Sequence, residues 1–258
     1  EKMGVFLFDF YPYLDCEDPL YVREKMNFFN MCRINLDFKG LKEATEEAGK
    51  MRDFNNKPWC FELQLNSIYY HAFEEEKYRD ALMQSEKLLK EVKAYGVTHI
   101  FLINAHTLMT TCSLVIGDIY AAKKSALNAY ELIRCNDDSE LYERMLTKVI
   151  VNLMGAHYVN NEFDDVIKRG SELLDIKHKR DSYGKIHFVH FFMALAFYCK
   201  DRWDDAAKHL KKAVCFLMAD SKPSDVNFIA MDGRFTMMLN DLSPYSEVIN
   251  FFRKEYGV

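Results

Sequence analysis

Asparagine is the residue type whose recurrence in this sequence points most directly to a binding chemistry. Four of these residues stand inside segments with helical spacing: Asn27, Asn66, Asn104 and Asn152. Asparagine is a poor helix-interior residue because its amide competes for backbone hydrogen bonds. The amide offers a donor and an acceptor together, which suits holding an extended peptide backbone irrespective of the peptide's side chains. The series predicts a ladder of amides that clamps a peptide, and pairing of these amides with neighbouring helices or water is the alternative.

Charged and aromatic residues near the asparagines extend this predicted site. Arg23 and Lys148 would hold a peptide carboxylate through charge-assisted hydrogen bonds, although two solvated surface charges explain them equally well. Phe188 belongs to an aromatic run at residues 187–193 that is either core or the wall of a pocket. The complete set of predicted peptide-binding residues is Arg23, Asn27, Asn30, Asn66, Tyr70, Asn104, Thr111, Lys148, Asn152 and Phe188.

No constellation in the sequence supports catalysis. The motifs GxSxG, GxxxxGK[ST], GxGxxG and HExxH are all absent. His187 and His190 have a spacing that can bind a metal on a helix, but no carboxylate stands one turn away on that face and no third ligand is evident. We therefore expect no catalytic residues, no metal and no cofactor. An enzyme with an all-helical fold remains a further hypothesis, which a bound cofactor or metal in the purified protein would support.

Composition and charge narrow the class of protein further. The chain has 258 residues, of which 49% are hydrophobic and 28% charged, so it is too apolar to be disordered. Its net charge of −5 provides no bulk positive field for nucleic acid or an anionic membrane. Seven cysteines at irregular spacing, without a CxxC motif, indicate reduced thiols. The apolar segment 3–14 contains Asp9 and Pro12 and is too short to span a membrane. We expect a cytoplasmic protein.

Proline positions and apolar spacing predict an all-α chain of about twelve helices. Proline fits the first turn of a helix, where its missing N–H would have no partner in any case. Four prolines precede runs with apolar spacing of three and four, and they predict helix starts at Pro19, Pro58, Pro223 and Pro244. No stretch shows the sustained alternation of a strand.

A repeat organises these helices. Five segments have an aromatic or aliphatic anchor followed by apolar or small residues three, seven and ten positions later. The anchors are Phe38, Tyr78, Ile119, Phe163 and Trp203, at spacings of 40, 41, 44 and 40 residues. These offsets share one helical face, and a period of this length is typical of a stack of helical hairpins. The four asparagines precede the first four anchors by 11, 12, 15 and 11 residues, which predicts that they project from one side of the stack.

Two of the segments that begin at these anchors resemble a known helical repeat. Tyr78-Arg-Asp-Ala81 and Trp203-Asp-Asp-Ala206 resemble the start of the second helix of a tetratricopeptide repeat, although the first-helix signature is missing and the repeats are longer than 34 residues. This resemblance implies a right-handed α-solenoid of five to six hairpins. We expect an N-terminal aromatic segment or linker at residues 1–17, repeats at 18–242, and a C-terminal capping helix at 243–258 that contributes to a dimer.

Long degenerate hairpins, 15 tyrosines, 20 phenylalanines and an acidic balance resemble the C-terminal receptor region of the RRNPP family of Gram-positive quorum-sensing regulators. The resemblance implies a repeat domain that binds a short signalling peptide on its concave face, often through asparagines. It also implies a homodimer, and DNA binding only through an N-terminal helix-turn-helix that is not evident in this chain. The alternative is a tetratricopeptide-type scaffold or adaptor that recognises another protein without sensing a peptide signal.

Overall fold

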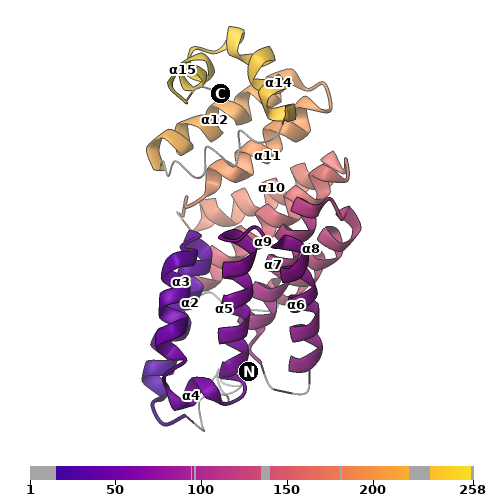
Figure 1. Ribbon diagram of the computed structural model, residues 1–258. Helices are drawn as coiled ribbons and strands as arrows, with labels where there is room; N and C mark the ends of the chain where they lie inside the picture. The colour runs from indigo at the N-terminus through magenta and orange to yellow at the C-terminus, as the bar shows by residue number, and fades with distance from the viewer. Residues whose placement is uncertain are drawn as a thin grey trace. The chain divides into compact units, whose positions relative to one another are not determined.

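The structure of the protein is a computed structural model that describes residues 16–93, 95, 97–134, 140–180, 182–220 and 233–256 (Figure 1). Over these ranges it has thirteen α-helices, one 3-10 segment and no strand, which confirms the all-α prediction. The α-helices are α2 (Pro19–Asn35), α3 (Phe38–Ala48), α4 (Arg52–Asn55), α5 (Trp59–Phe73), α6 (Tyr78–Val92), α7 (His99–Ile116), α8 (Ile119–Arg134), α9 (Glu140–Val159), α10 (Phe163–Lys179), α11 (Ile186–Tyr198), α12 (Trp203–Asp220), α14 (Gly233–Leu242) and α15 (Glu247–Tyr256). The 3-10 segment is η2 (Ser243–Tyr245).

Every predicted repeat anchor is the first residue of a helix, namely α3, α6, α8, α10 and α12. The residue three positions after each anchor is fully buried, as the periodic pattern predicted. These residues are Leu41, Ala81, Ala122, Val166 and Ala206. The anchors themselves are more exposed, and Trp203 retains 44% of its accessible surface. The buried face of each helix is therefore set by the small or aliphatic residues after the anchor rather than by the anchor.

The proline prediction holds where the structure describes it, with one shift in position. Pro19 is the first residue of α2, and the Asp18 side chain caps that helix by accepting a hydrogen bond from the backbone N–H of Tyr21. Pro58 directly precedes α5. Pro244 lies in η2 instead, and α15 begins at Glu247, so the predicted C-terminal helix starts later than residue 243. The predicted start at Pro223 and most of the predicted segment 1–17 lie outside the described residues.

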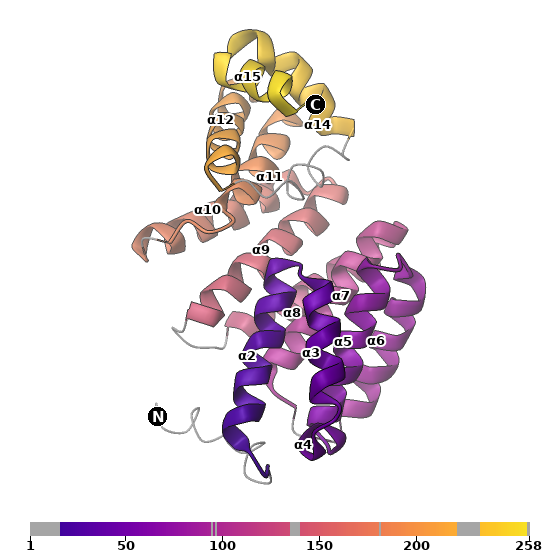
Figure 2. The same ribbon diagram turned by 60° about the vertical axis from the view of Figure 1, so that its left-hand side comes forward.

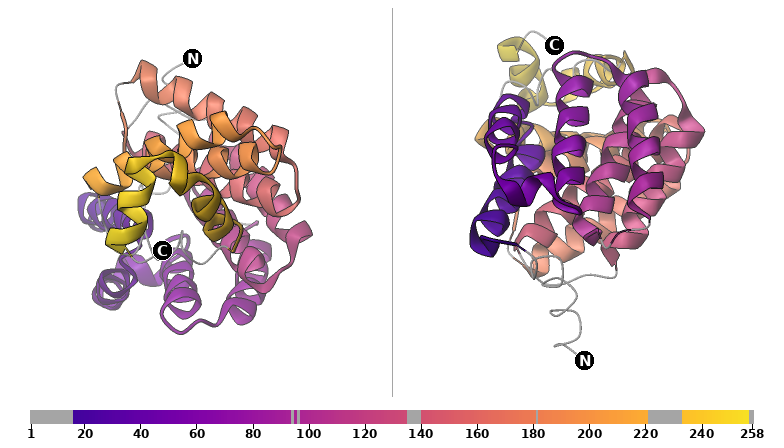
Figure 3. Two further views of the ribbon diagram at one scale, coloured as in Figure 1. Left: turned by 90° about the horizontal axis from the view of Figure 1, so that it is seen from above. Right: turned by 60° about the horizontal axis from the view of Figure 1, so that its bottom comes forward.

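The chain divides into two compact units, Glu1–Val149 and Ile150–Val258. In the first unit α2 packs against α3, both α3 and α4 pack against α5, and α5 to α8 each pack against the next helix, while α7 also contacts α5 (Figure 2). Aromatic rings join α3 to α5: Phe38 stacks on Phe73 with ring centroids 4.5 Å apart, and Tyr69 lies beside both rings. The right-hand view of Figure 3 shows the helices of the first unit, coloured indigo to magenta, side by side. Because the helices are held in this order, α2, α5 and α7 are close enough to share one polar site.

Helix α7 forms part of the core of the first unit. Among the described helices it alone has the length and apolar composition to cross a membrane, and half of its residues are buried inside the protein. It packs between α6 and α8. Core helices share this combination of length and composition with membrane-spanning ones, and the burial of Phe101, Leu108 and Cys112 accounts for it here.

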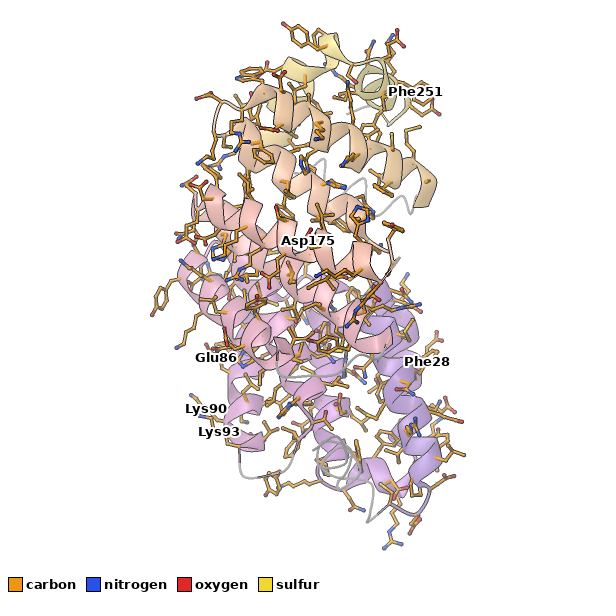
Figure 4. All side chains as sticks on the ribbon, turned by 180° about the vertical axis from the view of Figure 1, so that it is seen from behind. Phe28, Glu86, Lys90, Lys93, Asp175 and Phe251 are labelled. Carbon is orange, nitrogen blue, oxygen red and sulfur yellow. The ribbon has the colours of Figure 1, made fainter. Side chains whose placement is uncertain are left out.

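In the second unit α10, α11 and α12 pack in sequence, and α14 and α15 lie against α11 and α12 (Figure 3, left). Ile249 and Phe252 of α15 are buried, while Phe251 points into solvent (Figure 4). Helices α10 and α11 approach closely at Gly170, where an added Cβ would lie 2.6 Å from Cγ and Sδ of Met193. Glycine at this helix-interior position lets the Met193 side chain lie against the backbone of α10.

The substitution Gly170→Ala tests this close approach. Alanine gains about 1 kcal/mol of helix propensity over glycine, but overpacking a core costs about 1–3 kcal/mol. We expect Gly170→Ala to lower the melting temperature followed by circular dichroism. Gly233→Ala is the control, since a Cβ there meets nothing within 4 Å. A Gly170→Ala protein that melts at or above the wild-type temperature would show that α10 and α11 do not pack in this way.

Candidate functional site

A cluster of buried polar side chains lies inside the first unit, centred on Arg33. We call Asn30, Arg33, Glu62, Asn66 and Asn104 the Arg33 cluster. The Arg33 side chain is fully buried, with 0% exposure. Its Nη2 donates to Glu62 Oε2 at 2.7 Å and to Asn66 Oδ1, and its Nη1 donates to Asn30 Oδ1 at 3.3 Å. A guanidinium group therefore links two helices through one carboxylate and two amides.

Three helices supply the cluster. Helix α2 carries Asn30 and Arg33, which share one face because they are three residues apart. Helix α5 presents Glu62 and Asn66 one turn apart for the same reason. Helix α7 closes the cluster with Asn104, whose Nδ2 donates to Asn30 Oδ1 at 2.9 Å. Each of the three helices thus turns a polar stripe toward the others, inside a core that is otherwise apolar.

Lys148 of α9 is a second cation at this site. Its Nζ donates to the backbone oxygen of Arg33 at 3.0 Å and lies 5.5 Å from the ring centroid of Tyr69. The Arg33 guanidinium carbon lies 5.6 Å from the same centroid. The Lys148 residue is half-buried, and its ammonium group lies between the Arg33 backbone and the Tyr69 ring. Burial, and secondly the charge of Arg33, lower the pKa of Lys148 to about 7.

The site has more hydrogen-bond donors than acceptors. Two basic side chains, Arg33 and Lys148, come together with one carboxylate, that of Glu62, which pairs with Arg33. Among the described residues, Arg33 Nε and Asn66 Nδ2 are buried without a hydrogen-bond partner. A buried donor left in this state costs about 1–3 kcal/mol. An acceptor with negative charge would satisfy these donors.

The structure brings together four of the ten predicted binding residues. Asn30, Asn66, Asn104 and Lys148 come from four different helices and meet at the Arg33 cluster. Asn66 and Asn104 are only 1% and 3% exposed, and their amides bond within the protein. Side-chain pairing between neighbouring helices, which the sequence left as the alternative for this series, is thus what these two amides do.

The other predicted residues of the first unit form no hydrogen bond with the cluster among the described residues. Arg23 and Asn27 stand one turn apart on the exposed face of α2. Tyr70 is half-buried on α5, and the Lys42 ammonium lies 4.3 Å from its ring centroid. Thr111 donates its hydroxyl hydrogen to the backbone oxygen of Thr107 within α7.

Two predicted residues belong to the second unit. Asn152 of α9 is half-buried, and its Nδ2 has no hydrogen-bond partner among the described residues. Phe188 of α11 is half-buried beside the ring of His187, at a centroid distance of 4.3 Å. Neither residue is assigned to the Arg33 cluster.

Sequence reasoning missed Arg33 and Glu62, on which the cluster depends. A signal for both was present. Arg33 is the single charge in the run Phe28–Leu36, and Glu62 is the single charge in the run Trp59–Asn66. An isolated charge in an apolar helix needs a partner because burying it alone is costly. Two isolated opposite charges on neighbouring helices would have predicted the pair.

Histidines of the second unit form a different kind of site. His190 Nδ1 lies 3.0 Å from His209 Nδ1, so one ring donates to the other, and His190 pairs with this residue of α12 rather than with His187. Burial, together with neighbouring positive charge, lowers the pKa of His190 to about 3 and that of His209 to about 4. The two rings are therefore neutral at physiological pH.

One group of side chains in the described ranges has metal-ligand spacing: His157, Glu162 and Asp165 offer ligand atoms within 4.8 Å of one another. His157 Nδ1 is already hydrogen-bonded to Glu162 Oε2 at 2.6 Å, and Asn160 donates to the other oxygen of that carboxylate. The group also stands at the N-terminus of α10, where the helix dipole favours anions over cations. These contacts close the turn between α9 and α10.

The chain matches no protein-family model, no curated protein and no solved structure. Its own residues and their geometry are therefore the basis for assigning a function.

The histidine pair predicts how the second unit responds to acid. Both pKa values lie below the ordinary value of 6.5, so the folded state binds fewer protons than the unfolded state. The stability that the neutral pair contributes is complete above pH 6.5 and is lost as the pH falls toward 4. We expect His209→Gln to melt with a weaker dependence on pH between about pH 7 and about pH 5 than the wild type. His178→Gln, at an exposed position of α10, is the control, and equal pH dependence in all three proteins would contradict the prediction.

The Arg33–Glu62 pair predicts a non-additive effect on stability. Removing one partner of a buried ion pair leaves an uncompensated charge and costs about 3–5 kcal/mol. We expect Arg33→Met and Glu62→Leu each to lower the free energy of unfolding by about this amount, and the double variant to lose less than the sum. Urea unfolding measures the three values. The pair of Lys25 and the exposed Glu47, which also joins two helices of this unit, is the control, and its removal should cost much less because solvent screens it. Simple additivity at Arg33 and Glu62 would refute the pairing.

Proposed function

We propose that this chain is the peptide-sensing region of a cytoplasmic regulator. In this proposal the repeated hairpins form a right-handed α-solenoid of the tetratricopeptide type, similar to the receptor region of RRNPP regulators, and the chain acts as a homodimer. DNA would be bound only through a domain outside this chain. The observation that carries the proposal is the convergence of Asn30, Asn66, Asn104 and Lys148, all predicted from the sequence as ligand-binding residues, on one donor-rich cluster.

A row of polar residues leads along α2 from solvent into this cluster. Arg23, Asn27 and Asn30 are spaced by four and three residues, so they share one side of the helix. Arg23 and Asn27 are exposed, whereas Asn30 is buried and bonded to Arg33 and Asn104. An extended peptide lying along this row would meet exposed donors first and the buried cluster last. Asn66 and Asn104 support the floor of such a site rather than clamping the peptide directly.

Peptide binding at this position gives a route to regulation. The cluster joins α2, α5 and α7, and Lys148 adds α9, so a ligand held there contacts several hairpins at once. A ligand shifts a conformational equilibrium only by its difference in affinity for the two states. A peptide that contacts four helices favours the arrangement in which all four reach it, and a dimer partner or an attached domain would read that arrangement.

A protein-interaction scaffold is the second candidate, and a groove between α2 and α3 favours it. The groove has a volume of about 400 Å³ and is lined by Tyr21, Glu24, Phe28 and Glu43 among others. Phe28 is 49% exposed and projects outward from α2 (Figure 4). An exposed aromatic ring in a surface groove suits docking of a partner surface.

Affinity selection from a mixed pool of short synthetic peptides tests the proposal. We expect the protein to retain a subset of peptides, and the variant Arg23→Ala/Asn27→Ala to hold them about tenfold less tightly because it loses one charged and one amide contact. Both residues are exposed, so the melting temperature should not change. Lys90→Ala on α6, whose side chain points into solvent (Figure 4), is the control.

Two outcomes would contradict the proposal. If the protein retained no peptide from the pool, peptide sensing would be refuted as its function. Equal affinity of the wild type and the Arg23→Ala/Asn27→Ala variant would show that the row on α2 is not part of the site.

A further inference from the structure

Lys148 has an environment that a lysine in a purely structural role would not need. Its hydrogen bond among the described residues goes to a neutral acceptor, the backbone oxygen of Arg33. The charge that acts on its pKa is the like charge of the Arg33 guanidinium. Buried ammonium groups are ordinarily paired with a carboxylate, because desolvation without a counter-charge is costly.

The charges of the site do not balance without a further group. Glu62 neutralises Arg33 at 2.7 Å, and no carboxylate of the described residues forms an ion pair with Lys148. A protonated Lys148 would thus leave the site with one net positive charge. The same cluster has two further buried donors, Asn66 Nδ2 and Arg33 Nε. Neither has a hydrogen-bond partner among the described residues.

We propose that Lys148 and the Arg33 cluster bind a carboxylate group of the ligand. This inference rests on the proposed function, since the carboxylate would be the C-terminus or an acidic side chain of the bound peptide. A monovalent carboxylate matches the single net charge and brings oxygen acceptors to the unbonded donors. A phosphate dianion would leave the site with an excess negative charge, so the charge balance of the site favours the carboxylate.

Binding of the carboxylate is coupled to uptake of a proton by Lys148. In the free protein the pKa of Lys148 is lowered to about 7, and an adjacent carboxylate raises it again. The ligand therefore binds the protonated amine, and its affinity falls as the pH rises above about 7. Lys148 contacts the Arg33 backbone from α2 and the Tyr69 ring from α5, and Glu62 of α5 is paired with the Arg33 guanidinium. Burial raises the pKa of Tyr69, so this phenol stays neutral and does not obscure the lysine titration.

The experiment uses the smallest probe that carries the proposed group. N-acetyl-leucine has a free carboxylate beside a peptide group, and N-acetyl-leucinamide is its uncharged match. Nuclear magnetic resonance of the side-chain nitrogens, with the Lys148 signal assigned from its loss in Lys148→Arg, follows the titration of this amine. We expect N-acetyl-leucine at saturating concentration to raise the pKa of Lys148 by at least one unit, and we expect the amide and inorganic phosphate to leave it in place.

Two variants distinguish the effect of the positive charge at position 148 from the effect of proton uptake by Lys148. Lys148→Arg keeps a permanent positive charge, so it should bind N-acetyl-leucine with an affinity that does not change between about pH 6 and about pH 8. Lys148→Met should lose at least about tenfold in affinity, and circular dichroism checks that it folds. Lys90→Met on the exposed face of α6 is the matched control and should bind as the wild type does.

The outcomes distinguish this inference from the proposed function. Equal binding of the acid and the amide, or an acid that leaves Lys148 unshifted, would overturn the carboxylate site even if the peptide pool is retained. A phosphate response equal to that of the acid would replace the carboxylate with a general anion. A shift of Lys148 by the acid, with no peptide retained from the pool, would support the carboxylate site and remove peptide sensing.

Discussion

The buried ion pair between Arg33 and Glu62 is the interaction on which the first unit depends. A guanidinium group with no exposed surface is acceptable only when a carboxylate and several acceptors surround it. That requirement explains why Asn30, Asn66 and Asn104 occupy helix interiors where their propensity is poor. It also fixes the mutual register of α2, α5 and α7, because a shift of one residue in any of these helices would turn its polar group away from the cluster.

The same cluster accounts for the functional proposal. A pair that served stability alone would be replaced by apolar residues without loss, since buried ion pairs contribute little net free energy. Stability alone does not explain Lys148 or the unbonded donors Arg33 Nε and Asn66 Nδ2. Burying them costs free energy, and no carboxylate of the described residues pairs with Lys148 to offset that cost. A ligand that brings a negative acceptor turns these costs into binding free energy. The second unit shows the opposite arrangement, in which His190 and His209 satisfy each other and stay neutral.

Much of the fold could be predicted from the sequence. The five anchors mark five helix starts, and the buried Ala81, Ala122 and Ala206 follow from the helical period alone. The site was predictable only in part. The spacing of the asparagines identified Asn66 and Asn104, but spacing does not say whether a face meets solvent or another helix, and both proved to be buried. An isolated charge in each helix marks Arg33 and Glu62 as residues that need a partner, but their pairing spans 29 residues and depends on how the helices pack.

The central claim is that the donor-rich cluster of the first unit receives a ligand rather than serving as a closed structural core. An experimental density map of the protein purified from its source organism tests this claim most directly. The account predicts density for an extended chain that follows Arg23 and Asn27 along α2, with a carboxylate within hydrogen-bonding distance of Lys148 Nζ. Density with no carboxylate near Lys148 Nζ, where water or further protein groups besides the Arg33 backbone oxygen take its remaining donors, would contradict it, as would a co-purified peptide bound elsewhere.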